Sequence, residues 1–397
     1  MSLSGKAAVA LLAAALVLGP LACGGSKRVR RLQRQEIQQR LRRLETPGLV
    51  IGEFTLDDHA VVDGDTIRVA GLRTTLRLLA IDTEETFKSE ADRRLYEMGF
   101  DKYLQAKQGP SPRPVKAATP LGEAAKHFAE KFFAGVRTVR LERDHPKEIR
   151  GRYGRYLAYV FARKQGRWVN YNLECVRAGM SPYFTKYSYS RRFHDQFVAA
   201  QRQAQQARRG IWDPRREHYR DYPERLEWWN ARAEFIWRFE QEAMGRDNYI
   251  TLTHWDAVRR LERHLDREVV LLGLVGEIKL GDKGPTKVML SRRIGSDFPL
   301  VFFDKDVFGS SGIGGYRGEF VIVRGIVSKW HNRWRHRDEL QIVVNTPGQI
   351  TVSKMVPNYS GWDTEGEVER AEVEAERQHW RELLQQQQDK VEQEAQP

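Results

Sequence analysis

The sequence contains little cysteine and no apolar run long enough to span a membrane. Its two cysteines are Cys23 and Cys175, and its ten histidines are scattered, so no spacing predicts a zinc site. Cys175 lies in an amphipathic helical pattern and is expected to be a small buried residue. Charged residues make up 30% of the chain and the mean hydropathy is −0.61, which excludes an integral membrane protein.

The charge balance is strongly basic. Lysine and arginine number 66 against 53 aspartates and glutamates, which gives a net charge of +13 and an isoelectric point near 9.7. Such an excess suits a polyanionic partner, either nucleic acid or an anionic membrane surface, although it can also serve only to keep the surface soluble. At 397 residues the chain is long enough for two ordinary domains.

Residues 1–23 have the pattern of an export signal. One lysine precedes the apolar run Ala7–Leu18, which is too short for a membrane span. The sequence LACGG around Cys23 resembles a bacterial lipobox, in which this cysteine becomes the lipidated first residue, although a proline stands where leucine is usual. We therefore expect export to the bacterial cell envelope with a lipid anchor on Cys23. The alternative is an ordinary secretory signal with an incidental cysteine.

Two charged segments flank the predicted domains. Residues 24–47 form a basic linker, in which Lys27–Arg43 carries eight basic residues and one glutamate near helical spacing. This segment is either a solvated linker or a basic helix lying on anionic lipid or nucleic acid. Residues 353–397 are acidic and rich in glutamine, which predicts an exposed helical tail or a partner for the basic segment.

The stretch Val61–Thr86 concentrates the residues that can carry chemistry. It places Asp65 near one strand end, Arg77 inside an apolar strand, and Asp82 and Glu85 just past that strand. Carboxylates can hold a hard divalent cation, a further carboxylate can take a proton from water, and guanidinium groups bind phosphate bidentately. Arg77 alone could be an outward-facing strand charge, but the whole set indicates phosphodiester hydrolysis.

Residues 48–214 have the pattern of a small barrel with attached helices. Strands are predicted over Val50–Leu56, Ala60–Val62, Thr66–Val69, Thr75–Ile81, Val136–Leu141 and Arg155–Ala162, and helices after Thr119-Pro120 and over Trp168–Met180 and Arg191–Arg208. The apolar face of the helix after Thr119 is expected to be Ala124, Phe128, Phe132 and Phe133. The stretch Gly109–Pro114 is expected to be an exposed insertion. This order predicts the α+β class, with a mostly antiparallel barrel.

This first domain resembles the staphylococcal-nuclease-like, or thermonuclease, family. The resemblance rests on VVDGDTIRV, LRLLAIDTEET, RYGRYLAYVF, NYNLECVRAGMSPY and AQRQAQQARRGIW, which occur in the family order between residues 50 and 214. It implies an OB-type barrel of five strands with three helices. It also implies calcium-dependent hydrolysis of DNA and RNA that leaves 3′-phosphate ends.

The same resemblance implies roles for individual residues. Those implied to act in catalysis and metal binding are the calcium carboxylates Asp65 and Asp82 with the Thr83 carbonyl, the general base Glu85, and the phosphate-binding Arg77 and Arg155. Those implied to contact the nucleotide are Arg152 and Tyr153, together with Tyr183 or Tyr187 stacking on a base or sugar.

One position inside the motif departs from the family pattern. Glu84 stands where proline is usual, which is expected to loosen the backbone and to place a second negative charge beside Glu85. The segment between Thr86 and Thr119 is also longer than in compact relatives, and it could cover the cleft as a lid.

Residues 215–352 are predicted to contain a helical linker, 215–266, and a second barrel, 267–352. In the linker Trp228, Phe235 and Phe239 share one helical face, and a further helix is expected over Thr253–Asp266. The predicted strands Val269–Ile278, Thr286–Leu290, Leu300–Phe303, Glu319–Val327 and Leu340–Val344 form a succession that resembles OB-fold nucleic-acid-binding domains. The loop before the last strand is either a solvated hairpin or a nucleic-acid surface formed by Lys329, Trp330, Arg333, Trp334 and Arg335.

These observations predict an exported calcium-dependent nuclease whose second domain helps to hold DNA, RNA or another partner. Two alternatives are a non-catalytic nucleic-acid- or protein-binding module on the same fold, and an envelope lipoprotein with a vestigial nuclease. The presence of every candidate catalytic residue argues against the first, and Glu84 is the one sequence feature that favours the second.

Overall fold

The computed structural model describes residues 49–353, apart from residues 73, 112, 152–153, 292–296 and 334–335. Several predictions fall outside the described residues: the export signal with Cys23, the basic segment, the acidic tail, and the site candidates Arg152, Tyr153, Trp334 and Arg335. Among the helices that are described, none combines the length and the apolar character needed to cross a membrane.

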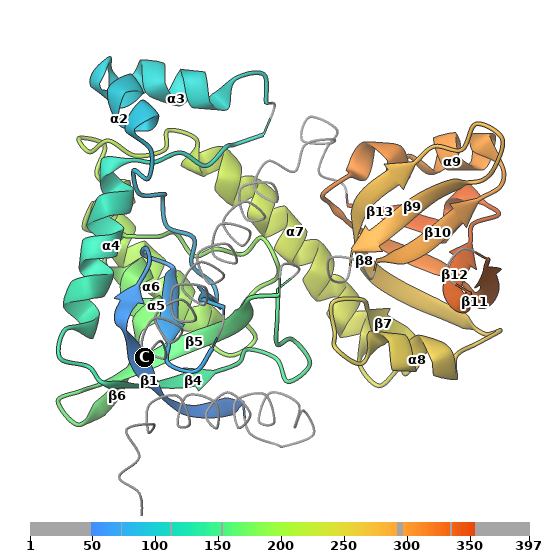
Figure 1. Ribbon diagram of the computed structural model, residues 1–397, viewed down its shortest axis with the longest axis horizontal. Coiled ribbons are helices and arrows are strands. Elements are labelled where there is room, and N and C mark those ends of the chain that lie inside the picture. The colour runs from blue at the N-terminus through green and yellow to red at the C-terminus, as the bar shows by residue number, and fades with distance from the viewer. Residues whose placement is uncertain are drawn as a thin grey trace, which may run out of the picture.

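The first sheet closes into a five-stranded barrel with a sixth strand at its edge (Figure 1). Its strands are β1 (Val50–Val61), β2 (Thr66–Val69), β3 (Leu76–Leu78), β4 (Thr138–Glu142), β5 (Tyr156–Lys164) and β6 (Arg167–Asn170). The order around the barrel is β3-β2-β1-β4-β5, and β5 closes the ring by pairing with β3 in parallel. This order is consistent with the OB-type barrel predicted from the sequence.

The first strand is longer than predicted. Residues 50–56 and 60–62 were expected to be separate strands, but β1 runs through both. It pairs with β4 along its first half and with β2 further on, across a register shift between Leu56 and Val61. The shift bends the strand, so one strand can serve two neighbours of a closed barrel.

The helix predicted over 168–180 begins later than expected. Gln165 and Gly166 both adopt positive φ, which turns the chain into the β5–β6 hairpin before any helix can form. The helical part is α5 (Tyr171–Arg177), and the Asn170 side chain caps it by accepting a hydrogen bond from the Leu173 N–H group.

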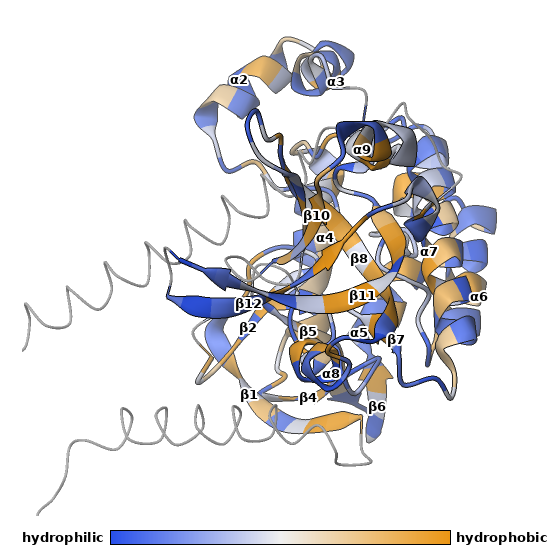
Figure 2. Ribbon diagram, turned by 90° about the vertical axis from the view of Figure 1, so that its right-hand side faces the viewer, coloured by the Kyte–Doolittle hydropathy of each residue, from blue (hydrophilic) through white to orange (hydrophobic). Residues whose placement is uncertain are grey.

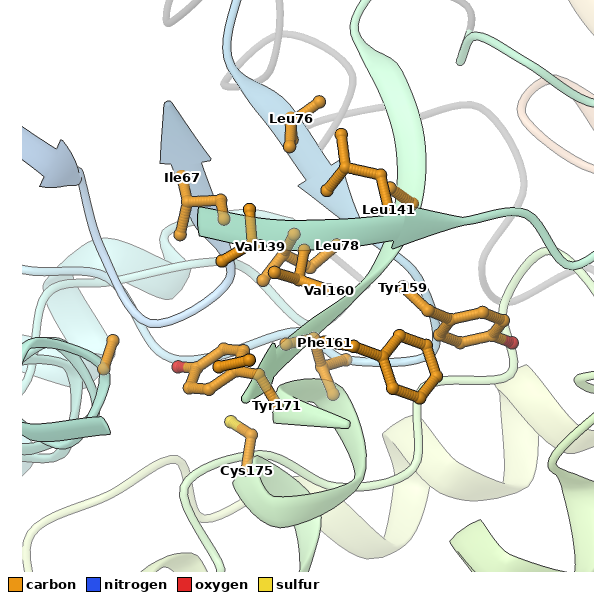
Figure 3. Packing of buried hydrophobic residues seen from close by; sticks show 14 of the residues in the cluster. Ile67, Leu76, Leu78, Val139, Leu141, Tyr159, Val160, Phe161, Tyr171 and Cys175 are labelled. Carbon is orange, nitrogen blue, oxygen red and sulfur yellow. The ribbon is translucent and has the colours of Figure 1, made fainter. Parts of the chain in front are cut away.

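Apolar side chains fill the barrel. Ile67, Leu76, Leu78 and Val139 are buried in its interior (Figure 3). Fully burying one such side chain stabilises the fold by about 1.5–3 kcal/mol. Cys175 on α5 is also fully buried, which confirms the prediction made for it.

The helix predicted after Thr119 is confirmed as α4 (Pro120–Phe133). The Thr119 hydroxyl caps it by accepting a hydrogen bond from the Gly122 N–H group. Its buried face differs from the prediction, because Ala125 and Ala129 are buried whereas Ala124 is only partly buried. Of the other predicted positions, Phe133 is buried and Phe128 and Phe132 are partly buried. The helix predicted over 191–208 is present as α6 (His194–Gln206).

The insertion before α4 is packed in part: of the stretch predicted to be exposed, Gly109 and Pro110 are exposed, but Ser111, Arg113 and Pro114 are buried. It contains α2 (Glu90–Glu97) and α3 (Phe100–Gln108). Phe100 and Tyr103 form a buried cluster with Tyr219 and Tyr222, which come from the region predicted as a linker. Arg113, inside the stretch expected to be exposed, is buried because it reaches the second barrel.

The linker is dominated by α7 (Tyr222–Ala243), which runs from the first barrel toward the second (Figure 1). Its predicted aromatic face is packed, since Trp228 and Phe239 are buried. The strand β7 (Tyr249–Thr251) follows and pairs with the second sheet. The helix expected over 253–266 shortens to α8 (Ala257–Arg263), because the residues up to Asp256 form turns next to β7.

The second sheet repeats the strand order of the first. Its strands are β8 (Glu268–Lys279), β9 (Thr286–Ser291), β10 (Phe298–Phe302), β11 (Phe320–Asn332), β12 (Arg337–Val343) and β13 (Ile350–Val352), with α9 (Lys305–Ser311) between β10 and β11. The ring runs β8-β9-β10-β12-β11, β11 pairs back to β8, and β10 and β12 are parallel. β8 and β11 are rich in apolar residues, whereas β12 is largely hydrophilic (Figure 2).

A buried charge cluster joins the second barrel to the rest of the chain. Glu319, directly before β11, accepts a hydrogen bond from Trp228 Nε1 at 2.9 Å. Guanidinium nitrogens of Arg113 and Arg232 each lie 3.3 Å from its oxygens, and all three charged side chains are at most 4% exposed. Because Arg113 belongs to the insertion and the other two partners to α7, one carboxylate connects three segments.

A pair of stacked histidines forms another contact between the first barrel and the segment after α7. The rings of His145 and His254 stack with centroids 4.7 Å apart. Burial lowers the pKa of His254 to about 3, although the nearby Glu148 carboxylate opposes this shift. The folded protein therefore favours the neutral ring. The contribution of the neutral His254 ring to the free energy of unfolding is complete above its ordinary pKa of 6.5 and is lost as the pH falls below that value.

We expect the free energy of unfolding to fall by about 2 kcal/mol through His254 between pH 6.5 and pH 5. The variant His254→Gln should lose most of this pH dependence, because its side chain does not titrate. Denaturant unfolding of both proteins at the two pH values measures the difference. His127→Gln is the matched control, since His127 is 81% exposed. An equal loss of stability in wild type and His254→Gln would contradict the expectation.

Candidate active site

The strand order brings together residues that are far apart in the sequence. β2 pairs antiparallel with β3, so Asp65, directly before β2, lies near Arg77. β3 pairs parallel with β5, so Arg155, directly before β5, lies beside the start of β3. Leu76 and Leu78 point into the core, so Arg77 between them projects from the opposite side of the strand.

Arg77 connects the two carboxylates that were predicted to bind metal. Its guanidinium forms ion pairs with Asp65 and Asp82, and its side chain is 15% exposed. Burial favours the neutral form of both carboxyl groups, but Arg77 and Lys116 outweigh burial and hold the pKa of Asp65 and of Asp82 below the usual range. Both carboxylates are therefore charged at neutral pH. Arg77 is not a solvated strand charge.

The segment after β3 is turned into the same site. Ala80 adopts a left-handed φ of 62°, which is strained for a residue with a Cβ atom and ends the strand. The Asp82 N–H group donates to Ser181 Oγ at 2.8 Å, and the Thr83 N–H group donates to Asp65 Oδ2 at 3.0 Å. The Asp65 carboxylate is thus bonded to the backbone of the segment that carries Asp82.

Glu84 strengthens this segment, contrary to the expectation that it loosens the backbone. Its buried carboxylate accepts hydrogen bonds from the Thr119 hydroxyl, from the Tyr219 N–H group at 2.8 Å and from the Tyr222 hydroxyl at 2.9 Å. Burial raises the pKa of Glu84 to about 7, so its negative charge is partly neutralised near neutral pH. Glu84 therefore joins the segment that carries Asp82 and Glu85 to the region around the start of α7.

The backbone of Glu85 is fixed by the start of α4. The Thr119 N–H group donates to the Glu85 carbonyl oxygen at 3.0 Å. A Cβ atom on Gly122 would lie 1.9 Å from that same oxygen, so only glycine allows the helix to approach so closely. The Glu85 side chain itself lines the cavity described below.

Lys116 is a charged group of the site that the sequence reasoning missed. Its ammonium nitrogen lies 2.9 Å from Asp82 Oδ1 and 3.4 Å from Glu85 Oε1, and its side chain is 13% exposed. Burial opposes its charge, but the carboxylates of Asp82 and Glu85 outweigh burial and hold the pKa of Lys116 well above the usual value. The sequence held no signal for it beyond its place in the segment predicted as a lid.

One cavity of about 190 Å³ is lined by the charged groups of the site other than Glu84. On the side of the first barrel it is lined by Asp65, Arg77, Asp82, Glu85, Lys116 and Arg155. Other lining residues come from α7 and the second barrel: Arg232, Leu274, Ser291, Gly318 and Phe320. The second barrel therefore borders the candidate active site, which the sequence did not predict.

The structure distinguishes between the two tyrosines predicted to stack on the nucleotide. Tyr187 is 51% exposed and lines the cavity. Tyr183 is buried, its hydroxyl accepts a hydrogen bond from the Ser190 N–H group at 2.7 Å, and its ring stacks on Phe197 with centroids 5.0 Å apart. Tyr183 is a core residue, so Tyr187 is the tyrosine of this pair that can reach a substrate.

The candidates in the second barrel lie on a hairpin rather than in a long loop. β11 and β12 are longer than predicted, because the residues between the predicted strands continue to pair with one another. Lys329 and Trp330 are therefore strand residues, and Arg333 follows in the turn. These three residues do not line the cavity near Glu85. Nucleic-acid binding on this hairpin stays a prediction.

The carboxylate oxygens of the site are ligands of the type that calcium binds. Asp65 and Asp82 offer buried, charged carboxylate oxygens that converge on one guanidinium, and calcium prefers oxygen ligands of this type. Within the described part of the chain, no group of three or more histidine, cysteine, aspartate or glutamate side chains is arranged to hold a metal. The side chains thus provide two carboxylates rather than a complete coordination shell.

Comparison with known proteins finds relatives of the first barrel. The family described as staphylococcal nuclease homologue matches residues 75–214, a range that includes Arg77, Asp82, Glu85 and Arg155 but not Asp65. An uncharacterised protein of Methanocaldococcus jannaschii is 33% identical over 155 residues, which are 38% of this chain and 69% of that protein. Two thermonucleases, of Staphylococcus hyicus and Staphylococcus intermedius, are 31% and 28% identical over 38% of this chain and over 72% and 73% of their own lengths.

Proposed function

Because this chain belongs to the family of staphylococcal nuclease homologues, we propose that its first barrel hydrolyses phosphodiester bonds of DNA or RNA. We propose further that the reaction requires calcium and leaves 3′-phosphate ends. The observation that carries the proposal is the convergence on one cavity of two paired carboxylates, a further carboxylate and two guanidinium groups. Phosphodiester hydrolysis needs such a combination of water activation and charge neutralisation.

Each residue has a role that follows from its charge and position. Calcium, when bound by Asp65 and Asp82 with the carbonyl of the next residue, would polarise the phosphate. Arg77 and Arg155 neutralise the charge that builds up on the phosphoryl oxygens, since a guanidinium group matches two phosphate oxygens at once. Glu85 accepts a proton from the attacking water, whose oxygen bonds to phosphorus while the bond to the 5′ oxygen breaks and that oxygen takes a proton from solvent.

Other parts of the chain support substrate binding. Tyr187, exposed at the cavity, is placed to stack on a base or sugar. The strand order of the second sheet supports its assignment to the OB class, and its position beside the cavity supports a part in holding nucleic acid. Export and lipid attachment at Cys23 belong to the same proposal and are motivated by the sequence of residues 1–23.

Removal of calcium is expected to stop the reaction. Chelator-treated protein should leave an end-labelled oligonucleotide intact and should digest it once calcium is restored, because the phosphate then lacks the cation that would polarise it. Gel analysis before and after phosphatase treatment measures the cleavage and identifies 3′-phosphate ends. Asp82→Asn, purified in the same way, controls for contaminating nucleases. Digestion in chelator at the rate seen with calcium would contradict the calcium requirement.

A further inference from the structure

We propose that Lys116 is a tethered cation that competes with calcium for Asp82 and Glu85 and so sets the calcium affinity of the site. The inference rests on the proposed calcium-dependent function. Lys116 belongs to the long insertion before α4 and not to the motif around Asp82.

The ammonium group of Lys116 lies against a candidate metal ligand. It lies 2.9 Å from Asp82 Oδ1, which is one of the oxygens offered to the metal, and 3.4 Å from Glu85 Oε1. A cation that binds this oxygen of Asp82 must share it with the ammonium group or displace it. Both positive charges draw on the same carboxylate in a largely buried site, where charges interact more strongly than in water.

The charge balance of the site also favours competition. Asp65, Asp82 and Glu85 carry three negative charges, and Arg77, Arg155 and Lys116 carry three positive charges, so these six groups are neutral together. Without the ammonium group they would carry −1. A divalent cation is attracted more strongly to the second arrangement, so removal of the lysine charge raises calcium affinity.

The backbone is held on both sides of Lys116. Arg225 donates a hydrogen bond to the carbonyl of Val115. The Tyr219 hydroxyl accepts from the Ala117 N–H group at 2.8 Å and donates to the Ala117 carbonyl at 2.6 Å. With both neighbours fixed and its side chain only 13% exposed, Lys116 differs from a mobile surface lysine.

The segment that carries Lys116 also contacts the second barrel. Arg113, three residues before Lys116, is buried and pairs with Glu319 at 3.3 Å. The insertion that positions the ammonium group is therefore anchored on the second barrel as well as on α7. Calcium affinity becomes a property of the assembled chain rather than of the first barrel alone.

Lys88 provides the matched comparison. Its ammonium nitrogen lies 3.3 Å from Glu85 Oε2, a distance similar to that of Lys116, but its side chain is 52% exposed. Solvent screens an exposed pair, so removal of the Lys88 charge should have little effect on a cation at Asp82.

Isothermal titration of calcium chloride into chelator-treated full-length protein tests the proposal. We expect Lys116→Met to bind calcium at least roughly tenfold more tightly than wild type. Lys88→Met should stay within about threefold of wild type, and Lys116→Arg, which keeps the charge, should bind no more tightly than wild type. Asp82→Asn combined with Lys116→Met should abolish binding, which assigns the heat to this site. Circular dichroism checks that each variant is folded.

The outcomes separate the inference from the function on which it rests. Unchanged or weaker calcium binding by Lys116→Met, with binding by wild type, would overturn the role of Lys116 and leave the calcium site standing. If Lys116→Met does not fold, Lys116→Arg becomes the test. Tighter calcium binding by Lys116→Arg than by wild type would then overturn the role of the lysine charge. If neither wild type nor any variant binds calcium at millimolar concentration, the calcium-dependent function itself fails, and the inference fails with it.

Discussion

Replacing Glu85 with glutamine is expected to slow phosphodiester hydrolysis by roughly 10²–10⁴-fold. The amide has nearly the shape of the carboxylate, but it cannot take the proton of the attacking water. Asp65, Asp82, Arg77 and Arg155 remain, so substrate binding should change little and the loss should fall on kcat rather than on KM. Steady-state kinetics on a defined oligonucleotide measure both quantities.

The neighbouring Glu84 offers a control with the same chemical change. Glu84→Gln keeps an acceptor for the Tyr219 N–H group, and burial already raises the pKa of Glu84 to about 7, so the neutral amide resembles a form that wild type populates. Activity should stay within about threefold of wild type. If both variants lose activity equally, distortion of the segment explains the loss. If neither does, Glu85 is not the general base.

The candidate catalytic residues were predictable because their signal is local. Asp65, Arg77, Asp82 and Glu85 lie within one short stretch, and each stands at a strand end or at a position where an apolar residue is usual. The parallel pairing of β3 with β5 then brings Arg155 to the same end of the barrel as these residues. Apolar periodicity likewise predicted the five strands of the second ring.

The contacts that place the rest of the site are not local, and no pattern along the chain reports them. Glu84 accepts its hydrogen bond from Tyr219, 135 positions away, and Glu319 accepts one from Trp228, 91 positions away. The charge of the insertion predicted exposure, yet Arg113 is buried and Lys116 is only 13% exposed, because carboxylates pair with them. A buried charge needs a specific partner, and only the folded chain shows which partner that is.

Glu319→Ala is expected to destabilise the folded chain by about 3–5 kcal/mol. The change removes the carboxylate that faces the buried guanidinium groups of Arg113 and Arg232, together with the acceptor of Trp228 Nε1. Two positive charges would remain away from water and close to each other, which is more costly than the loss of one hydrogen bond. Denaturant unfolding followed by circular dichroism measures the loss of stability. If the two barrels unfold separately, the loss is expected in the transition of the second barrel.

Glu268→Ala, in the same barrel, is the matched control for this prediction. Glu268 pairs with Arg324 at 2.9 Å, but the two side chains are 53% and 56% exposed, so the expected loss is below about 1 kcal/mol. Equal losses in the two variants would show that burial of the cluster does not decide its strength. Glu319→Ala should also tighten calcium binding, because Arg113 anchors the segment that carries Lys116. A destabilised variant with unchanged calcium affinity would show that the second barrel stabilises the first without acting through Lys116.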